Sequence, residues 1–461
     1  MMTTVAEQLA AFAQRLTFDD LPETVVHEAK RRVIDSIGCA LGAFDSVPCR
    51  IARKVARAVQ SRCPATLLGT THASSPDLAA FANGTMVRYL DFNDTYLSKE
   101  PAHPSDNIAA ALAAAEAEGA DGKDLITSII IGYEIQCRLC DAAALRTRGW
   151  DHVTYGALST ALVAAKLMGL SETQMVHALG LAGVPNVALR QTRVGELSMW
   201  KGCAFANAAR NGIFAALLAR QGMTGPAPLF EGEKGFFNQV TGPFRLPSLG
   251  EKGRPFKMMD TYLKFYPAEY HAQSAIEAAL LLRPNFSPND IHAITVKTFD
   301  VAVEIIGTGP EKWRPRNRET ADHSLPYLVA AAFMDGKVGL EQFTDARIAD
   351  PKLRALIQTV SVTADPELSQ AYPDAMPNQV EVKTVRGRTF TQNVTYPKGH
   401  PKRPLSDREV EEKFILLTGR VLPKKQIRRL LDRLWKLDSL KKTDELLSLC
   451  CVPNQTKGRP A

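Results

Sequence analysis

The first 221 residues place apolar side chains at the three- and four-residue spacing of amphipathic helices, in segments separated by Gly, Pro and Ser. Several of these segments, such as 108–117 and 157–165, consist mainly of alanine and other small residues. Because small faces let helix backbones approach closely, the pattern predicts a compact helical bundle. Its clearest helices are expected over residues 22–41, 124–145, 154–167 and 198–219.

The pattern changes after about residue 269, where short alternating, β-branched stretches begin. Strands are expected over 292–299, 359–363 and the hairpin 380–394, and helices over 320–333 and 340–348. Ser406 is then expected to cap an amphipathic helix that returns to the helical part. We therefore predict a mainly α protein. Its large all-helical domain comprises residues 1–268, completed by 397–461, and its smaller α+β lid domain comprises 269–396.

Charge and composition narrow the classes of function. Residues 401–461 contain 15 Lys and Arg against 8 Asp and Glu, which accounts for the whole net charge of +7. A nucleic-acid-binding surface needs a broad basic field, so no nucleic-acid partner is expected, although binding through the basic tail stays open. No segment looks like a secretory leader or a membrane span, so we expect a cytoplasmic protein whose eight cysteines are free thiols.

Titratable residues stand at three expected helix starts: His103, His152 and Lys201. A lysine in a first helical turn is disfavoured by the helix dipole unless an anion binds there. Helix N-termini with Lys and His bind carboxylates or phosphates, so these positions indicate an anionic ligand. The alternative is ordinary structure, in which Ser105 caps the next helix, the lysine is solvated and the histidines have no special role.

The absence of three common motifs argues against nucleotide binding and zinc-protease activity. The chain has no Gly-x-x-x-x-Gly-Lys loop, no Gly-x-Gly-x-x-Gly after a strand and no His-Glu-x-x-His, so nucleotide and zinc-protease chemistry lose support. Cys137 and Cys140 lie in a helical pattern without a second cysteine pair, and we interpret them as packing residues.

Residues 264–271 lie at the junction of the two predicted domains, where clefts form.

The polar motifs together resemble the MmgE/PrpD family, and the resemblance covers nearly the whole chain. It rests on residues 90–95 (Leu-Asp-Phe-Asn-Asp-Thr), 103–105 (His-Pro-Ser), 148–152 (Arg-Gly-Trp-Asp-His), 199–204 (Met-Trp-Lys-Gly-Cys-Ala), 224–226, 230–232, 264–271 (Lys-Phe-Tyr-Pro-Ala-Glu-Tyr-His) and 321–327. Members include 2-methylcitrate dehydratase, cis-aconitate decarboxylase and an iminodisuccinate epimerase. The resemblance implies a helical domain with an α+β lid, a homodimer, a small carboxylate substrate, and neither metal nor cofactor.

The resemblance also implies the site. The expected catalytic residues are Asp91, His103, His152, Lys201 and Lys264, and the expected substrate-binding residues are Thr95, Tyr266 and His323. The lysines would hold carboxylates and stabilise developing charge, while one histidine removes a carbon-bound proton and the other protonates the departing hydroxide. Which histidine does which stays open, and Asp91 is expected to orient a histidine by accepting its second ring proton.

The expected activity is dehydration of a small tricarboxylate such as 2-methylcitrate to 2-methyl-aconitate. Three alternatives use the same residues: decarboxylation of cis-aconitate, epimerisation of a related dicarboxylate, and carboxylate binding without catalysis.

Overall fold

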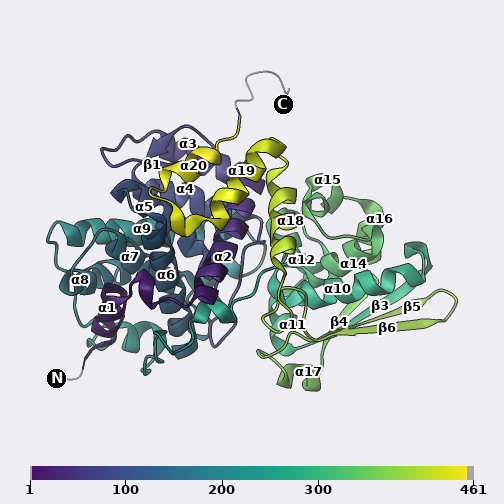
Figure 1. Cartoon of the computed structure of the whole chain (residues 1–461). Helices are drawn as coiled ribbons and strands as arrows, with labels where there is room; N and C mark the ends of the chain where they lie inside the picture. Colours follow the sequence, from purple (N-terminus) through teal and green to yellow (C-terminus); the bar gives the residue numbers. More distant parts are fainter. Residues whose placement is uncertain (1–2, 454–461) are drawn as a thin grey trace.

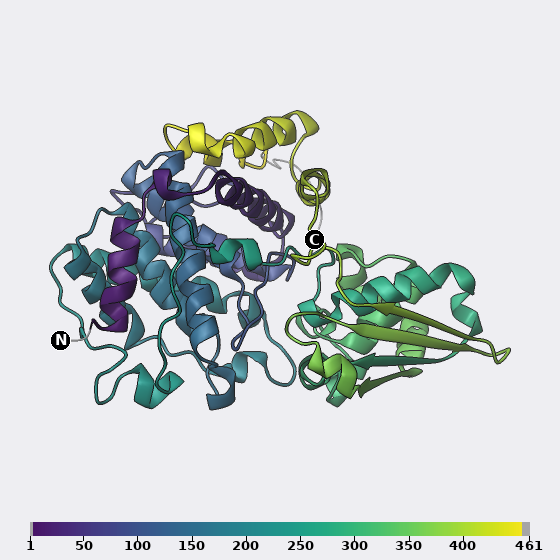
Figure 2. The same cartoon turned by 60° about the horizontal axis from the view of Figure 1, so that its bottom comes forward.

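The computed structural model describes residues 3–453, and 57% of the structure is helical. A helical body and a smaller α+β part lie side by side, and the C-terminal helices run across the body (Figures 1 and 2). The predicted mainly α fold with a small sheet is confirmed. No helix within residues 3–453 is both long and apolar enough to cross a membrane.

Alanine-rich helices form the centre of the body. Helix α7 packs closely against α9, where a Cβ atom added to Gly212 would lie 2.2 Å from Thr160 Oγ1. Small residues therefore set the helix spacing, as the sequence predicted. The body comprises α1 (Val5–Arg15), α2 (Glu23–Gly42), α3 (Val47–Arg57), a hairpin of β1 (Ala65–Thr66) and β2 (Ala73–Ser74), α4 (Pro76–Tyr89), α5 (Asn107–Glu118), α6 (Gly122–Ala142), α7 (Val153–Leu167), α8 (Glu172–Gly183) and α9 (Ala204–Arg220).

The second part is built on a four-stranded sheet in the order β4-β3-β5-β6. Strands β3 and β4 are parallel, and the other two pairs are antiparallel. Ile294, Val296 and Thr298 of β3 are buried, as its alternating sequence requires. The strands are β3 (Ile291–Thr298), β4 (Val360–Ala364), β5 (Asn378–Thr384) and β6 (Thr389–Val394); the helices are α10 (Gln273–Leu282), α11 (Asp300–Ile306), α12 (Pro310–Trp313), α13 (Arg318–Ala321), α14 (Leu325–Asp335), α15 (Asp345–Ile348), α16 (Pro351–Ile357) and α17 (Pro366–Gln370).

Three helices predicted as continuous are interrupted. The expected helix 320–333 breaks between α13 and α14, because Ser324 accepts a hydrogen bond from the Tyr327 amide and starts a new helix with Pro326 in its first turn. Thr344 caps α15 in the same way and divides the expected helix 340–348. Ahead of α9, a separate 3-10 turn, Met199–Gly202, replaces the first turn of the expected helix 198–219.

The chain returns to the body after β6. Ser406 and Glu409 form a reciprocal capping box at the start of α18 (Asp407–Thr418), as predicted for Ser406. Helix α18 packs along α2, and α19 (Lys424–Trp435) follows it onto the same helix before α20 (Asp444–Leu449). The exact domain boundaries at 268/269 and 396/397 stay predictions.

Candidate active site

A cavity of about 370 Å³ lies between the two parts of the molecule. Its walls combine the body and the α+β part, and they carry a high density of charged and imidazole groups. Six of the eight predicted site residues line it, and Lys201 lies beneath its wall. The lining includes Arg88, Asp91, Thr95, His103, His152, Arg190, Arg193, Lys264, Glu269, Lys312 and His323.

Asp91 lies directly after the end of α4 and is the only residue other than glycine with a positive φ, 52°, within residues 3–453. Aspartate tolerates this conformation better than most residues. Arg88 Nη1 donates to Asp91 Oδ1 at 2.6 Å, Lys201 Nζ lies 3.0 Å from Oδ2, and Lys264 Nζ also contacts Oδ1. Burial raises the pKa of the Asp91 carboxyl, but the three cations outweigh burial and lower the pKa well below its usual value.

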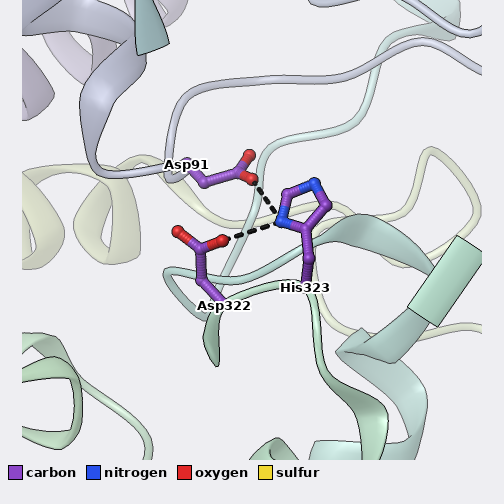
Figure 3. A group of neighbouring side chains, drawn as sticks. All are labelled: Asp91, Asp322 and His323. Atoms are coloured by element: carbon purple, nitrogen blue, oxygen red, sulfur yellow. Dashed lines mark hydrogen bonds and ion pairs between the residues drawn. The ribbon is translucent and has the colours of Figure 1, made fainter. Parts of the chain in front are cut away.

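Asp322 and His323 project from the break between α13 and α14 toward Asp91 (Figure 3). His323 Nδ1 lies 2.7 Å from Asp322 Oδ1 and 3.4 Å from Asp91 Oδ2. These three groups are close enough to hold a metal ion. However, Lys201 Nζ lies 2.6 Å from Asp322 Oδ1, 3.0 Å from Asp91 Oδ2 and 3.1 Å from His323 Nδ1. The ammonium group thus fills the position between the same three atoms.

His323 is the histidine nearest to Asp91, although the sequence left open which histidine Asp91 orients. Burial, and then the neighbouring Lys201 ammonium, lower the pKa of His323 to about 4. The ring is therefore neutral at neutral pH despite its two carboxylate neighbours.

Both nitrogens of His103 are occupied. Nδ1 lies 2.7 Å from the Asp94 carbonyl oxygen and Nε2 lies 2.9 Å from Arg88 Nη2. A guanidinium only donates, so Nε2 accepts and Nδ1 carries the proton. Burial and the Arg88 charge hold the pKa of His103 well below its usual value. His103 is therefore neutral, and its Nε2 lone pair accepts a hydrogen bond from Arg88 and orients that side chain.

His152 differs from His103 in that, within residues 3–453, only one of its two ring nitrogens has a hydrogen-bond partner. Nδ1 lies 3.0 Å from Asp151 Oδ1, whereas Nε2 is buried and finds no hydrogen-bond partner in the described part of the chain. Arg193 Nε donates to the other Asp151 oxygen at 2.9 Å and Arg193 Nη1 donates to the Lys201 carbonyl at 3.1 Å. Burial lowers the pKa of His152 although Asp151 opposes this effect. Asp151 therefore fixes a neutral tautomer whose Nε2 lone pair is unused.

Thr95 lines the cavity and donates from Oγ1 to the Ala102 carbonyl at 3.0 Å. Tyr266 does not enter this cavity. The Gln273 side chain accepts from the Tyr266 amide at 3.0 Å and donates to its carbonyl at 2.9 Å, which turns the ring against Phe265 in a separate groove. Its position gives no support to the expected substrate contact.

The alternative reading of Ser105 as a helix cap is wrong. Helix α5 begins without a side-chain cap, and Ser105 Oγ accepts instead from Asn93 Nδ2 at 2.9 Å. The Ser105 amide donates to Asp94 Oδ1 at 2.9 Å. The motif around His103 is thus held together by its own polar side chains.

Some functional residues were not found from the sequence. Arg88 stands one helical turn before Asp91, and this spacing was a usable signal. Lys413 of α18 gave no local signal. Its Nζ donates to the Phe92 carbonyl at 2.6 Å and to the Lys264 carbonyl at 2.9 Å, and it lies 2.7 Å from Asp35 Oδ1. It connects, from behind, the two loops that carry Asp91 and Lys264.

This arrangement defines a class: a two-part protein with a buried, net cationic cavity that holds a histidine–aspartate pair, suited to binding a small anion and moving a proton. The MmgE/PrpD N-terminal domain matches residues 7–248, and the MmgE/PrpD C-terminal domain matches residues 266–437. The chain belongs to the MmgE/PrpD family, as its motifs indicated.

Curated relatives are similar over most of their length. The chain is 31% identical to the 2-methylcitrate dehydratase of Cupriavidus necator, covering 86% of this chain and 87% of the relative. It is 28% identical to the enzyme of the same name from Salmonella typhimurium, covering 87% of each chain. It is 27% identical to the cis-aconitate decarboxylase of Homo sapiens, covering 98% of this chain and 96% of the relative.

Proposed function

We propose that this chain is a hydro-lyase that dehydrates a small tricarboxylate, such as 2-methylcitrate to 2-methyl-aconitate, by acid/base elimination without a metal. The observation that carries the proposal is the His152 imidazole, which Asp151 holds as the neutral tautomer with Nε2 unpaired at the cavity. The names of the similar dehydratases supply the substrate class.

Substrate carboxylates bind the cationic wall. Arg88, Lys201 and Lys264 surround Asp91 and Asp322, and Arg88 also lies 3.9 Å from Asp106, whose pKa burial raises to about 7. While Asp106 is protonated and the histidines are neutral, this group keeps one excess positive charge. In a dry cavity that charge stabilises the negative charge that grows on a substrate carboxylate as the adjacent C–H bond breaks.

Two buried groups carry out the two proton transfers, one as base and one as acid. His152 Nε2 takes the carbon-bound proton, and Asp151 stabilises the imidazolium that forms. Lys264 lines the cavity, and burial lowers its pKa, so its ammonium is a suitable acid for the departing hydroxide, which leaves as water. His103 holds Arg88 in place, which gives the two histidines different tasks.

The test incubates chelator-treated protein separately with 2-methylcitrate, citrate and cis-aconitate. Conjugated-alkene absorbance follows the reaction, and mass spectrometry identifies products. An alkene formed from 2-methylcitrate with loss of water supports the proposal. Absence of product from both hydroxy acids contradicts it.

Decarboxylation is the second candidate, because the similarity to the human cis-aconitate decarboxylase extends over 98% of this chain. It begins with the same carboxylate binding and differs in the bond that breaks. Release of carbon dioxide from cis-aconitate in the same experiment would assign the chain to this reaction.

We also propose that the protein is a homodimer, with one face of α3 in the interface. Val47, Ile51 and Val55 recur every fourth residue on this helix and are 44%, 53% and 55% exposed. An apolar stripe of this kind is typical of a protein–protein contact. Ile51→Glu is expected to convert the dimer to monomer in light-scattering measurements; a wild-type monomer contradicts the proposal.

A further inference from the structure

Lys312 is a buried cation in the α+β part. It belongs to α12, lines the cavity and is only 5% exposed. Within residues 3–453 its ammonium group forms no ion pair shorter than 4.0 Å and donates no side-chain hydrogen bond, so it is left facing the cavity. Burial lowers the pKa of Lys312; the nearby Glu311 charge opposes this effect and the Lys201 ammonium adds to it, and the pKa stays below its usual value. A buried charge in this state is costly unless an anion joins it.

The neighbouring carboxylates are committed elsewhere. Glu269 Oε1 contacts His271 Nδ1 at 2.6 Å, and Asp322 pairs with Lys201. The Glu311 carboxylate folds back on Gly309, where it would lie 2.5 Å from an added Cβ. Their charges act on Lys312 from a distance, Glu311 most strongly, but none of them forms an ion pair with it.

The other cations of the cavity do not share this property. Lys201 and Lys264 both contact Asp91, and Arg193 pairs with Asp151. Arg190 also lacks an ion pair within the described residues, but it is only half-buried and therefore more accessible to solvent than Lys312. Lys312 is thus the cavity cation whose charge most needs a ligand.

The position of Lys312 is fixed by the fold. Ser324, which caps α14 directly after His323, donates from Oγ to the Lys312 carbonyl oxygen. The lysine is therefore tied to the same break that carries Asp322 and His323. It stands on the α+β side of the cavity, whereas Lys201 and Lys264 belong to the helical body.

We propose that Lys312 binds one substrate carboxylate from the α+β side of the cavity and thereby selects tricarboxylates over dicarboxylates. This inference rests on the proposed function and extends it to substrate choice. The body cations hold the carboxylate next to the reacting carbon, and Lys312 pairs with a further carboxylate that a dicarboxylate lacks.

The experiment measures binding of citrate and of malate by titration calorimetry. Lys312→Met keeps the length of the side chain and removes the charge, while Lys312→Arg keeps the charge. We expect Lys312→Met to weaken citrate binding by about 10- to 100-fold, the usual loss of a charge-assisted hydrogen bond, with a much smaller effect on malate. Lys312→Arg should retain most of the affinity. Lys297→Met, on an exposed position of β3, is the matched control.

Thermal unfolding separates binding from folding. Because Lys312→Met removes a largely buried charge that has no ion pair, the ligand-free variant should unfold at the same or a higher temperature than the wild type. Its citrate-induced rise in unfolding temperature should shrink.

Two results would overturn the inference and leave the proposed function standing. One is unchanged citrate affinity in Lys312→Met while Lys201→Met loses binding. The other is an equal loss of citrate and malate affinity with a lowered unfolding temperature. If the wild type neither binds nor converts any tricarboxylate, the proposed function fails and the inference fails with it.

Discussion

Four histidines line the cavity, and three of them, His103, His152 and His323, are neutral for the same reason and differ in what their nitrogens contact. Burial is the largest cause of the lowered pKa at His103, His152 and His323. His103 uses both nitrogens and His323 uses Nδ1 among Asp91, Asp322 and Lys201, whereas His152 keeps a buried, unpaired Nε2. His271 also pairs with a carboxylate and keeps Nε2 unpaired within the described residues, but its ring packs against Phe299 and Tyr372, whereas His152 lies beside His103, with ring centroids 5.7 Å apart. We therefore assign the base to His152.

Replacement of this base tests the assignment. His152→Gln is expected to lower kcat by about 10²- to 10⁴-fold, because the amide cannot accept the proton from carbon. The far-ultraviolet circular dichroism should not change. His292→Gln, on an exposed position of β3, is the control and should keep wild-type turnover. Equal turnover in both variants would remove His152 from the mechanism.

The pH dependence follows from the direction of the same shift. The pKa of His152 is lowered from its ordinary value of 6.5, so the neutral base persists as the pH falls below 6.5 and is lost only at the lower pKa. The acid limb of the profile of kcat/KM against pH should therefore lie below pH 6.5. A midpoint above 6.5 would contradict the neutral, buried histidine.

Site residues lie where helices begin, end or break. Asp91 follows α4, His152 precedes α7, and Lys201 stands in the 3-10 turn before α9. Asp322 and His323 fill the break between α13 and α14. The rigid bundle thus presents its polar side chains from helix ends, which explains why the motifs were visible as polar interruptions of apolar patterns.

The spacing of α7 and α9 supports this geometry. Gly212→Ala would place a Cβ atom 2.2 Å from Thr160 Oγ1 and 2.9 Å from the Ala157 carbonyl oxygen. The resulting overpacking is expected to lower the free energy of unfolding by about 1 to 3 kcal/mol in chemical denaturation. Phe214→Ala, on the exposed face of the same helix, should change it by less than about 0.5 kcal/mol. Similar stability of the two variants would contradict close packing at Gly212.

Lys413 joins parts of the chain that are distant in sequence. Lys413→Met leaves Asp35 buried without its ion pair and is expected to cost about 3 to 5 kcal/mol of unfolding free energy. It should also lower kcat, because the carbonyls of Phe92 and Lys264 lose their shared donor.

A second variant separates these two effects. Adding Asp35→Asn to Lys413→Met removes the unpaired charge, so stability in denaturant should largely return while kcat stays low. Recovery of both stability and turnover would mean that Lys413 acts on folding alone.

The sequence by itself determined the classes of structure and the chemical groups. Helical and alternating periodicities are local properties of the chain, so they predicted the bundle, strands β3 to β6 and the Ser406 cap. Polar residues at helix starts likewise indicated an anion site at His103, His152 and Lys201. The resemblance of the motifs to the MmgE/PrpD family added Asp91, Lys264 and His323, and the fold brings all six to one site.

Tertiary structure alone decided how these groups interact. Burial and neighbours from distant segments set which nitrogen of each histidine is occupied, and Gln273 turned Tyr266 away from the cavity. Lys413 reaches Lys264 across 149 residues. Lys312 gains its significance from its place in the cavity wall and from the lack of an ion pair within residues 3–453. Protonation and pairing depend on distances in space, which no local pattern along the chain encodes.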